Sequence, residues 1–220
     1  MDQQPASSGP QPHDTHAIAT GAYSAREQGG GGIKTTLVNL IPPATLVAVI
    51  AFWALAPQAT VDYPWTFVFV GVAIMAWIQS LELFFERHEG WRLNKREFAT
   101  DVFYVALTYT VIAWVSSVVA EQPLLSLKES LGIATPWLQQ LPFVVQAAIV
   151  LFLVEFGQYW LHRWMHNSYP LWLTHAPHHH LTQLNALKGA VGNPIELVLI
   201  SLSIVALFDF DLAALFCGFS

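Results

Sequence analysis

Charged side chains are scarce in this chain, and the shortfall is concentrated in long uncharged blocks. Asp, Glu, Lys and Arg make up 11% of the 220 residues, whereas a typical soluble domain carries about a quarter. Hydrophobic residues make up 54%. This balance excludes an ordinary soluble globular domain and places the chain in the membrane class.

Cysteines and basic clusters are also lacking. Cys217 is the only cysteine, so neither an intrachain disulfide nor a cysteine-based zinc cluster can form. The net charge is −6, and no basic stripe follows the chain, which excludes nucleic acid as a partner.

The N-terminal segment lacks the apolar core that a signal peptide would have. Residues 1–34 are polar and rich in Gly, Ser, Gln and Pro, and we predict that they form a disordered cytoplasmic tail.

Long apolar runs are what the chain does contain. A bilayer core of roughly 30 Å requires about 20 apolar residues in a helix. Four segments come near that length, namely 37–56, 65–85, 102–120 and 142–160. A fifth stretch, 195–219, is interrupted by Asp209 and Asp211, and forms either two half-length pieces or a re-entrant hairpin. We therefore predict that residues 35–220 form one all-α, polytopic membrane helix bundle.

The distribution of basic residues predicts the orientation of this bundle. Cytoplasmic loops carry an excess of Lys and Arg. Successive connections between the four spans lie on alternate sides of the membrane. Most basic residues then fall on the side that holds the tail and the histidines, namely Arg26, Lys34, Arg87, Arg92, Lys95, Arg96, Arg163 and Lys188. The opposite side has Lys128 beside Asp62, Glu121 and Glu129. We predict a multi-pass protein with its N-terminus and histidines in the cytoplasm.

Six of the nine histidines lie in two clusters at the end of the fourth apolar segment. His162 and His166 are four residues apart, so both project from one face of a helix. The second cluster contains His175, His178, His179 and His180. Pro177 restricts Ala176 to extended geometry, and the second cluster should converge from either side of a bend. We predict a metal site in which His180 is the weakest candidate, because three adjacent side chains cannot all aim at one point.

Two polar side chains share the helical stripe of the first histidine pair. Glu155 and Tyr159 precede His162 and His166 at the spacing of one helix face. A carboxylate within an apolar run needs a partner. Glu155 either accepts the second N–H of a ligand histidine or bonds to another span. Imidazole binds iron, zinc, copper and nickel, so the ligand type alone leaves the metal open.

Five short motifs carry a resemblance to a known family. They are LELFF at 81–85, TDVFY at 100–104, ExxxYWxHRxxH at 155–166, LWxxHxxHH at 171–179 and NPxE at 193–196. With these motifs, residues 77–196 resemble the fatty acid hydroxylase/sterol desaturase superfamily of membrane non-haem di-iron enzymes. The resemblance implies a four-helix membrane base beneath a cytosolic cap that holds two irons. The positions that match its metal ligands are His162, His166, His175, His178 and His179.

The chain departs from the family pattern in two places. Family members usually have another histidine group downstream, whereas here no histidine follows His180. Asn193 stands where many members have histidine, and we expect it to support the site rather than to bind metal. Five or six imidazoles complete one metal site, so one iron or a zinc ion is the alternative to two irons. The chain is then a truncated product, half of a shared site or a one-metal variant. Its end within an apolar stretch favours truncation.

The resemblance implies an iron- and dioxygen-dependent oxidoreductase of lipid biosynthesis. Its substrate would be a fatty acyl chain, sterol or carotenoid, hydroxylated or desaturated with electrons from a ferredoxin or a cytochrome b5-like donor. The alternative is a truncated or non-catalytic membrane remnant that binds metal. A zinc protease is disfavoured because Arg163 stands where its glutamate base would lie. Histidines clustered outside the bilayer also disfavour a transmembrane b-type cytochrome.

Overall fold

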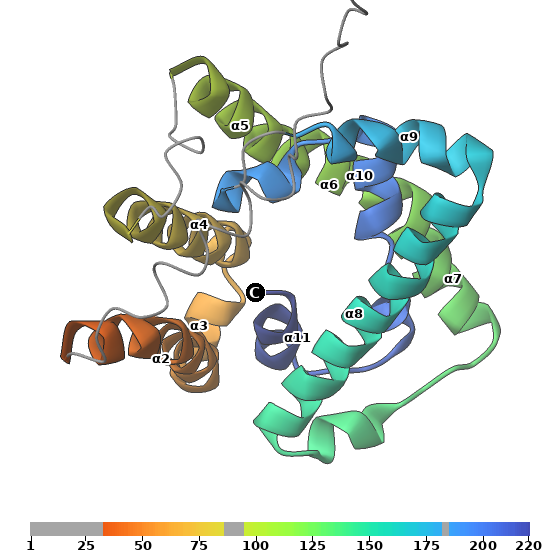
Figure 1. Ribbon diagram of the computed structural model, residues 1–220. Helices are drawn as coiled ribbons and strands as arrows, with labels where there is room; N and C mark the ends of the chain where they lie inside the picture. The colour runs from red at the N-terminus through yellow and green to blue at the C-terminus, as the bar shows by residue number, and fades with distance from the viewer. Residues whose placement is uncertain (1–32, 86–94, 182–184) are drawn as a thin grey trace, which may run out of the picture. The chain divides into compact units, whose positions relative to one another are not determined.

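A computed structural model describes residues 33–85, 95–181 and 185–220, and every regular element in these ranges is a helix (Figure 1). The chain divides into two compact units, Met1–Val47 and Ala48–Ser220. The predicted tail up to residue 32 and the loop with Arg87 and Arg92 lie outside the described residues. The prediction of an all-α membrane helix bundle is confirmed.

Four helices are long and apolar enough to cross a bilayer. The first two and the short helix between them are α2 (Ile33–Leu55), α3 (Gln58–Val61) and α4 (Thr66–Phe85). The third comprises α5 (Lys95–Leu107), η2 (Thr108–Ile112), α6 (Ala113–Ser116), η3 (Ser117–Glu121) and α7 (Gln122–Ser130). The fourth is α8 (Phe143–Asn167), which follows η4 (Pro136–Gln140).

Large apolar side chains cover the exposed faces of these helices. Examples that are more than half exposed are Phe69, Phe84, Trp114, Phe152 and Trp164. A water-soluble protein rarely exposes so many large apolar groups together. The exposed faces therefore suit a lipid environment, in agreement with the length and composition of the four helices.

The third long helix extends well beyond the predicted segment 102–120, because it runs from Lys95 to Ser130. Two of its turns, η2 and η3, are π-helical. Pro123 lies at the start of α7 and has no backbone N–H to donate. The wider turn of η3 directly precedes it, and such π turns let a helix continue where its regular hydrogen bonds are interrupted.

The segment after α8 folds back as α9 (Tyr169–His179). Asn167 ends α8, with its Nδ2 donating to the carbonyl of Arg163 at 2.6 Å. Ser168 is extended, and Pro170 occupies the first turn of α9, where a missing N–H costs nothing. The prediction of extended geometry at Ala176 is wrong, since α9 runs through Pro177. A following proline disfavours the helical conformation without forbidding it.

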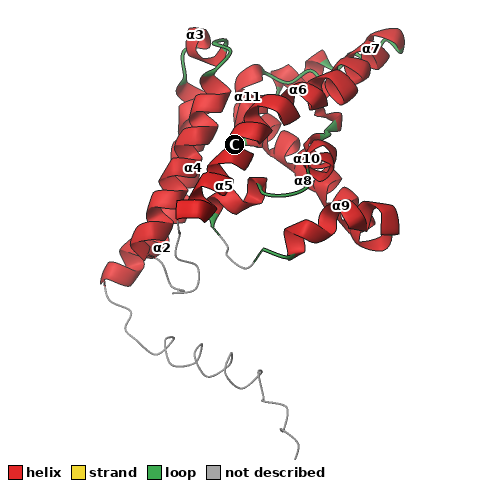
Figure 2. Cartoon of the chain, turned by 90° about the horizontal axis from the view of Figure 1, so that it is seen from above, coloured by secondary structure: helices red, strands yellow, loops and turns green. Residues whose placement is uncertain are grey.

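The C-terminal apolar stretch forms two short helices, the first of the two predicted alternatives. They are α10 (Pro194–Ser201) and α11 (Leu212–Phe219), with the short turns η5 (Ala186–Ala190) and η6 (Ile204–Leu207) preceding them. Asp211 accepts from the Gln146 amide at 2.9 Å and its backbone N–H donates back to Gln146 at 2.9 Å. Gln146 lies at the start of α8, whereas the histidines lie at its end, near α9 (Figure 2). Asp211 therefore anchors the stretch at the opposite end of α8.

Asp209 anchors the same bend through a charged contact, and this contact predicts a pH dependence. Its carboxylate contacts Lys128 Nζ at 2.5 Å and accepts from the Thr135 backbone N–H at 2.7 Å. The hydrogen bond from Lys128, followed by that from Thr135, lowers the pKa of Asp209. The stabilisation is therefore present at neutral pH and lost as the pH falls through the lowered pKa.

We expect Asp209→Asn to lower the thermal stability of the detergent-solubilised protein near neutral pH and to flatten its decline on acidification. Unfolding curves from neutral pH to about pH 3 would measure this decline. The matched control is Asp62→Asn, which removes an exposed carboxylate bonded to Gln58. Equal acid profiles for the two variants would contradict the assignment.

Gly218 allows α11 to approach α8 closely. A Cβ at this position would lie 2.5 Å from Val150 Cγ1 and 3.0 Å from the Ala147 carbonyl oxygen. Val150 is fully buried, so Gly218→Ala should lower the free energy of unfolding by about 1–3 kcal/mol, measured by denaturant titration. The control Gly157→Ala lies on α8 with open space around its Cβ and should be neutral or slightly stabilising. Similar effects for both glycines would contradict the close packing.

Candidate metal centre

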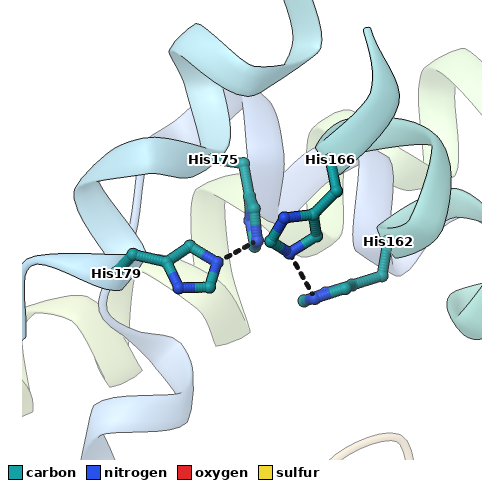
Figure 3. Close-up of side chains that lie close together, drawn as sticks. All are labelled: His162, His166, His175 and His179. Atoms are coloured by element: carbon teal, nitrogen blue, oxygen red, sulfur yellow. Dashed lines mark hydrogen bonds between the residues drawn. The ribbon is translucent and has the colours of Figure 1, made fainter.

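Four histidine side chains converge where α9 folds back on the end of α8 (Figure 3). α8 supplies His162 and His166, and α9 supplies His175 and His179, so each helix contributes a pair four residues apart. One potential ligand atom from each residue lies within 4.8 Å of the others. The Nε2 atoms are 3.1 Å apart in the α8 pair and 2.9 Å apart in the α9 pair. Continuous helix through Pro177 is what places the second pair on one face.

This donor set fits one transition-metal ion. Imidazole nitrogens bind such an ion at about 2.0–2.1 Å, so two ligands of one ion lie at most about 4.2 Å apart. The four ligand atoms lie within 4.8 Å of one another, so they need to move together only slightly to bind one ion. Four imidazoles suit iron, zinc, copper or nickel, and do not suit the hard cations magnesium and calcium.

The surroundings favour the neutral imidazole that metals require. His175 is completely buried, whereas the other three are exposed. Desolvation lowers the pKa of His179, and the neighbouring His175 and His166 lower it further. Four imidazoles this close repel one another when protonated, so metal binding and proton loss are coupled.

The remaining predicted ligands lie outside the four-nitrogen group. The His178 ring is centred 5.6 Å from that of His175 and 5.8 Å from that of His179. His178 also lines an adjoining cavity. His180 is exposed at the end of α9. The structure thus brings together four of the five predicted ligands, and His178 lies beside them.

The three polar residues expected to support the ligand histidines are exposed or form hydrogen bonds with other residues. Glu155 is exposed on α8, about two turns before His162. Tyr159 is exposed, and its hydroxyl accepts a hydrogen bond from Arg163 Nη1 at 3.1 Å. Asn193 caps α10, with its Oδ1 accepting from the backbone N–H of Ile195 at 2.9 Å.

Two residues at the site were not singled out from the sequence. Glu196 Oε1 lies 2.6 Å from His175 Nδ1, and both side chains are buried. The ring of Trp172 is centred 5.4 Å from that of His166 and 5.5 Å from that of His179. Trp172 lies three residues before His175 on the same helix, and this spacing could have identified it. Glu196 ends the NPxE motif, but only the fold places it beside a histidine.

A cavity of about 400 Å³ adjoins the imidazoles. Its lining residues are His162, His178, His179, Leu181, Asn185, Lys188 and Gly189. Lys188 is buried, and its ammonium contacts Glu97 at 2.6 Å and Asp101 at 2.7 Å. Burial lowers the pKa of Lys188, but hydrogen bonds with Asp101 and Glu97 outweigh this effect and raise it overall. Lys188 therefore stays charged.

Acidic side chains of α4 and α5 hold this cavity wall in place. Asn185 Nδ2 donates to Asp101 Oδ2 at 3.2 Å, and the backbone N–H of Ala186 donates to Glu82 Oε2 at 2.9 Å. Glu82 and Asp101 come from the LELFF and TDVFY motifs, respectively. These two motifs therefore connect α4 and α5 to the segment that borders the histidines.

Comparisons with known proteins found matches to the part of the chain that holds the histidines. Residues 147–219, which contain the four histidines and Glu196, match the family model described as fatty acid hydroxylase. A stretch of 53 residues is 43% identical to a Delta(7)-sterol-C5(6)-desaturase of Nicotiana tabacum. It covers 24% of this chain and 20% of that protein, so the match spans about a fifth of the relative's length. No solved structure matches the chain. These matches confirm the resemblance to the fatty acid hydroxylase/sterol desaturase superfamily, and residues 147–219 are the part of the chain that the family model covers.

Proposed function

We propose that this protein binds iron through His162, His166, His175 and His179 and oxidises a membrane lipid with dioxygen. The observation that carries the proposal is the convergence of two histidine pairs from α8 and α9, with one nitrogen of each residue within 4.8 Å of the others. The family match over 147–219 supports the oxidation of a lipid. The reaction class is hydroxylation or desaturation of a fatty acyl chain, a sterol or a carotenoid.

The chain's own residues bind the ion and shape its surroundings. Bound iron would supply the activation of dioxygen that attack on an unactivated C–H bond requires. The imidazoles hold the ion, and Trp172 packs against two of them. The adjoining cavity gives a lipid carbon a route to the imidazoles, because His162 and His179 line both. Lys188 is paired with two carboxylates, which reduces the electrostatic cost of an apolar chain beside it.

A membrane setting would deliver the substrate to this cavity. The four long apolar helices support a multi-pass protein, with the histidines where α8 leaves the bilayer. The excess of lysine and arginine on the histidine side supports a cytoplasmic site and N-terminus. A cytoplasmic ferredoxin or a cytochrome b5-like protein would then supply electrons. A second iron, as the superfamily implies, would need ligands beyond the four-nitrogen group.

A metal-binding protein without catalytic turnover is the second candidate. It is favoured because, among the described residues, the donor group comprises four histidines, enough for one ion only. Zinc would suit such a site as well as iron does.

Dioxygen-dependent turnover separates the two candidates. Protein purified without a His tag would be loaded with ferrous iron and incubated with bilayer lipids, ferredoxin, ferredoxin reductase and NADPH. Lipid products would be analysed by mass spectrometry, with the His162→Ala/His178→Ala variant as control. New hydroxyl groups or double bonds that require dioxygen, and are absent with the variant, support the enzyme. Unchanged lipids beside a retained metal ion support the non-catalytic candidate.

A further inference from the structure

Glu196 contacts the most deeply buried imidazole of the cluster. Its Oε1 lies 2.6 Å from His175 Nδ1, and the two side chains are 3% and 1% exposed. An ionised carboxylate only accepts hydrogen bonds, so beside ionised Glu196 the shared proton lies on Nδ1 of His175. This contact leaves Nε2 of His175 as the atom with a free lone pair. Nε2 is also the atom that faces His179, at 2.9 Å.

The second oxygen of this carboxylate has no hydrogen-bond partner among the described residues. Gly192 lies beside this oxygen, since a Cβ at that position would be 3.2 Å from Glu196 Oε2. A buried negative charge with one neutral hydrogen-bond donor is costly. A positive charge on the far side of His175 would offset that cost.

Local sequence fixes the position of the carboxylate. Asn193 caps α10 through its hydrogen bond from Ile195, and Pro194 begins the helix. Glu196 therefore lies in the first helical turn, where a carboxylate is favoured by the free N–H groups of that turn. The turn is placed against α9, so the carboxylate is preorganised for His175 before any ion binds.

We infer that Glu196 is a positioning residue that acts through His175 and raises the metal affinity of the site. The inference rests on the metal site of the proposed function. Glu196 fixes His175 in the tautomer that offers Nε2, and its uncompensated charge favours a cation on the imidazole. Because this charge is buried, Glu196 should slightly lower the thermal stability of the metal-free protein and raise that of the metal-bound protein.

The test compares metal affinity with metal-free stability for Glu196→Gln. Affinity for Co²⁺ and Zn²⁺ would be measured in detergent by chelator competition, and stability by thermal unfolding without metal. We expect the affinity to fall by about 10–100-fold, as is usual for residues behind a ligand histidine. The metal-free protein should unfold at the same temperature or higher, because an isosteric amide carries no buried charge. The control Glu155→Gln removes an exposed carboxylate of α8 and should change neither quantity.

A double-variant cycle shows whether Glu196 acts through His175. In a His175→Ala background, Glu196→Gln should change the remaining affinity little, because the residue through which it acts is absent. Unchanged affinity in the single variant, or a clear loss of metal-free stability, would overturn the inference and leave the four-histidine site intact. Failure of the unaltered protein to bind any of these ions would instead refute the proposed function itself.

Discussion

Replacing His175 by alanine is expected to weaken metal binding by more than about 100-fold. The expected loss exceeds the 10–100-fold typical of residues that only support a ligand. His175 lies at the centre of the cluster, since its ring is centred 4.5 Å from His162, 4.9 Å from His166 and 4.6 Å from His179. Its removal takes away one potential ligand nitrogen and leaves the buried carboxylate of Glu196 without its hydrogen bond to His175.

The matched control for this prediction is His180→Ala, at the residue that directly follows α9. His180 is exposed and lies outside the four-nitrogen group, so its removal should leave the bound metal unchanged. Elemental mass spectrometry would count metal per chain for both variants and for the unaltered protein. If the His175→Ala variant retained its ion while the His180→Ala variant lost it, the geometry of the site described above would be refuted.

Lys188→Ala should have the largest effect on stability, lowering the free energy of unfolding by about 3–5 kcal/mol. Asp101 is completely buried, and Lys188 is the cation that contacts it, at 2.7 Å. Removal of the ammonium would leave Asp101 buried without a compensating charge, and would also break the contact to Glu97. Denaturant titration in detergent micelles would measure the change.

Lys95→Ala provides the control, because Lys95 is exposed at the start of α5. An exposed lysine typically contributes less than about 1 kcal/mol. The double variant Lys188→Met/Asp101→Asn should recover part of the loss, since it removes both buried charges together. A loss for Lys188→Ala as small as that for Lys95→Ala would contradict the buried ion pair.

The membrane architecture could be predicted because it depends on segment length and polarity alone. Uninterrupted apolar runs of about 20 residues have one stable form in a bilayer, a helix that satisfies its own backbone hydrogen bonds. The residues at which the helices begin and end were less predictable. The third helix continues beyond residue 120, because η3 accommodates the proline that follows it.

The histidine pairs could be predicted in part, and the carboxylate could not. His162 and His166 follow from helical spacing alone. The α9 pair required the knowledge that a helix continues through Pro177, which local rules disfavour. Glu155 shares the stripe of the ligands, yet it is exposed. Glu196 instead reaches His175 from α10, and only the packing of α10 on α9 determines that contact.

The acidic residues of the C-terminal stretch show the same limit. Asp209 and Asp211 interrupt an apolar run, which suggested a bend without indicating their partners. In the structure both are satisfied by side chains distant in sequence, Lys128 and Gln146. Their role is to anchor the bend, and it depends on long-range pairing that spacing does not encode.

X-ray absorption spectroscopy at the metal edge would show whether the histidines of α8 and α9 hold a metal ion. Protein purified without a His tag and supplied with iron or zinc would first have its metal content counted. We expect at least one bound ion per chain, with a nitrogen shell at about 2.1 Å and the outer-shell scattering of several imidazoles. Protein that retains no ion, or an ion whose shell lacks imidazole scattering, would contradict this expectation.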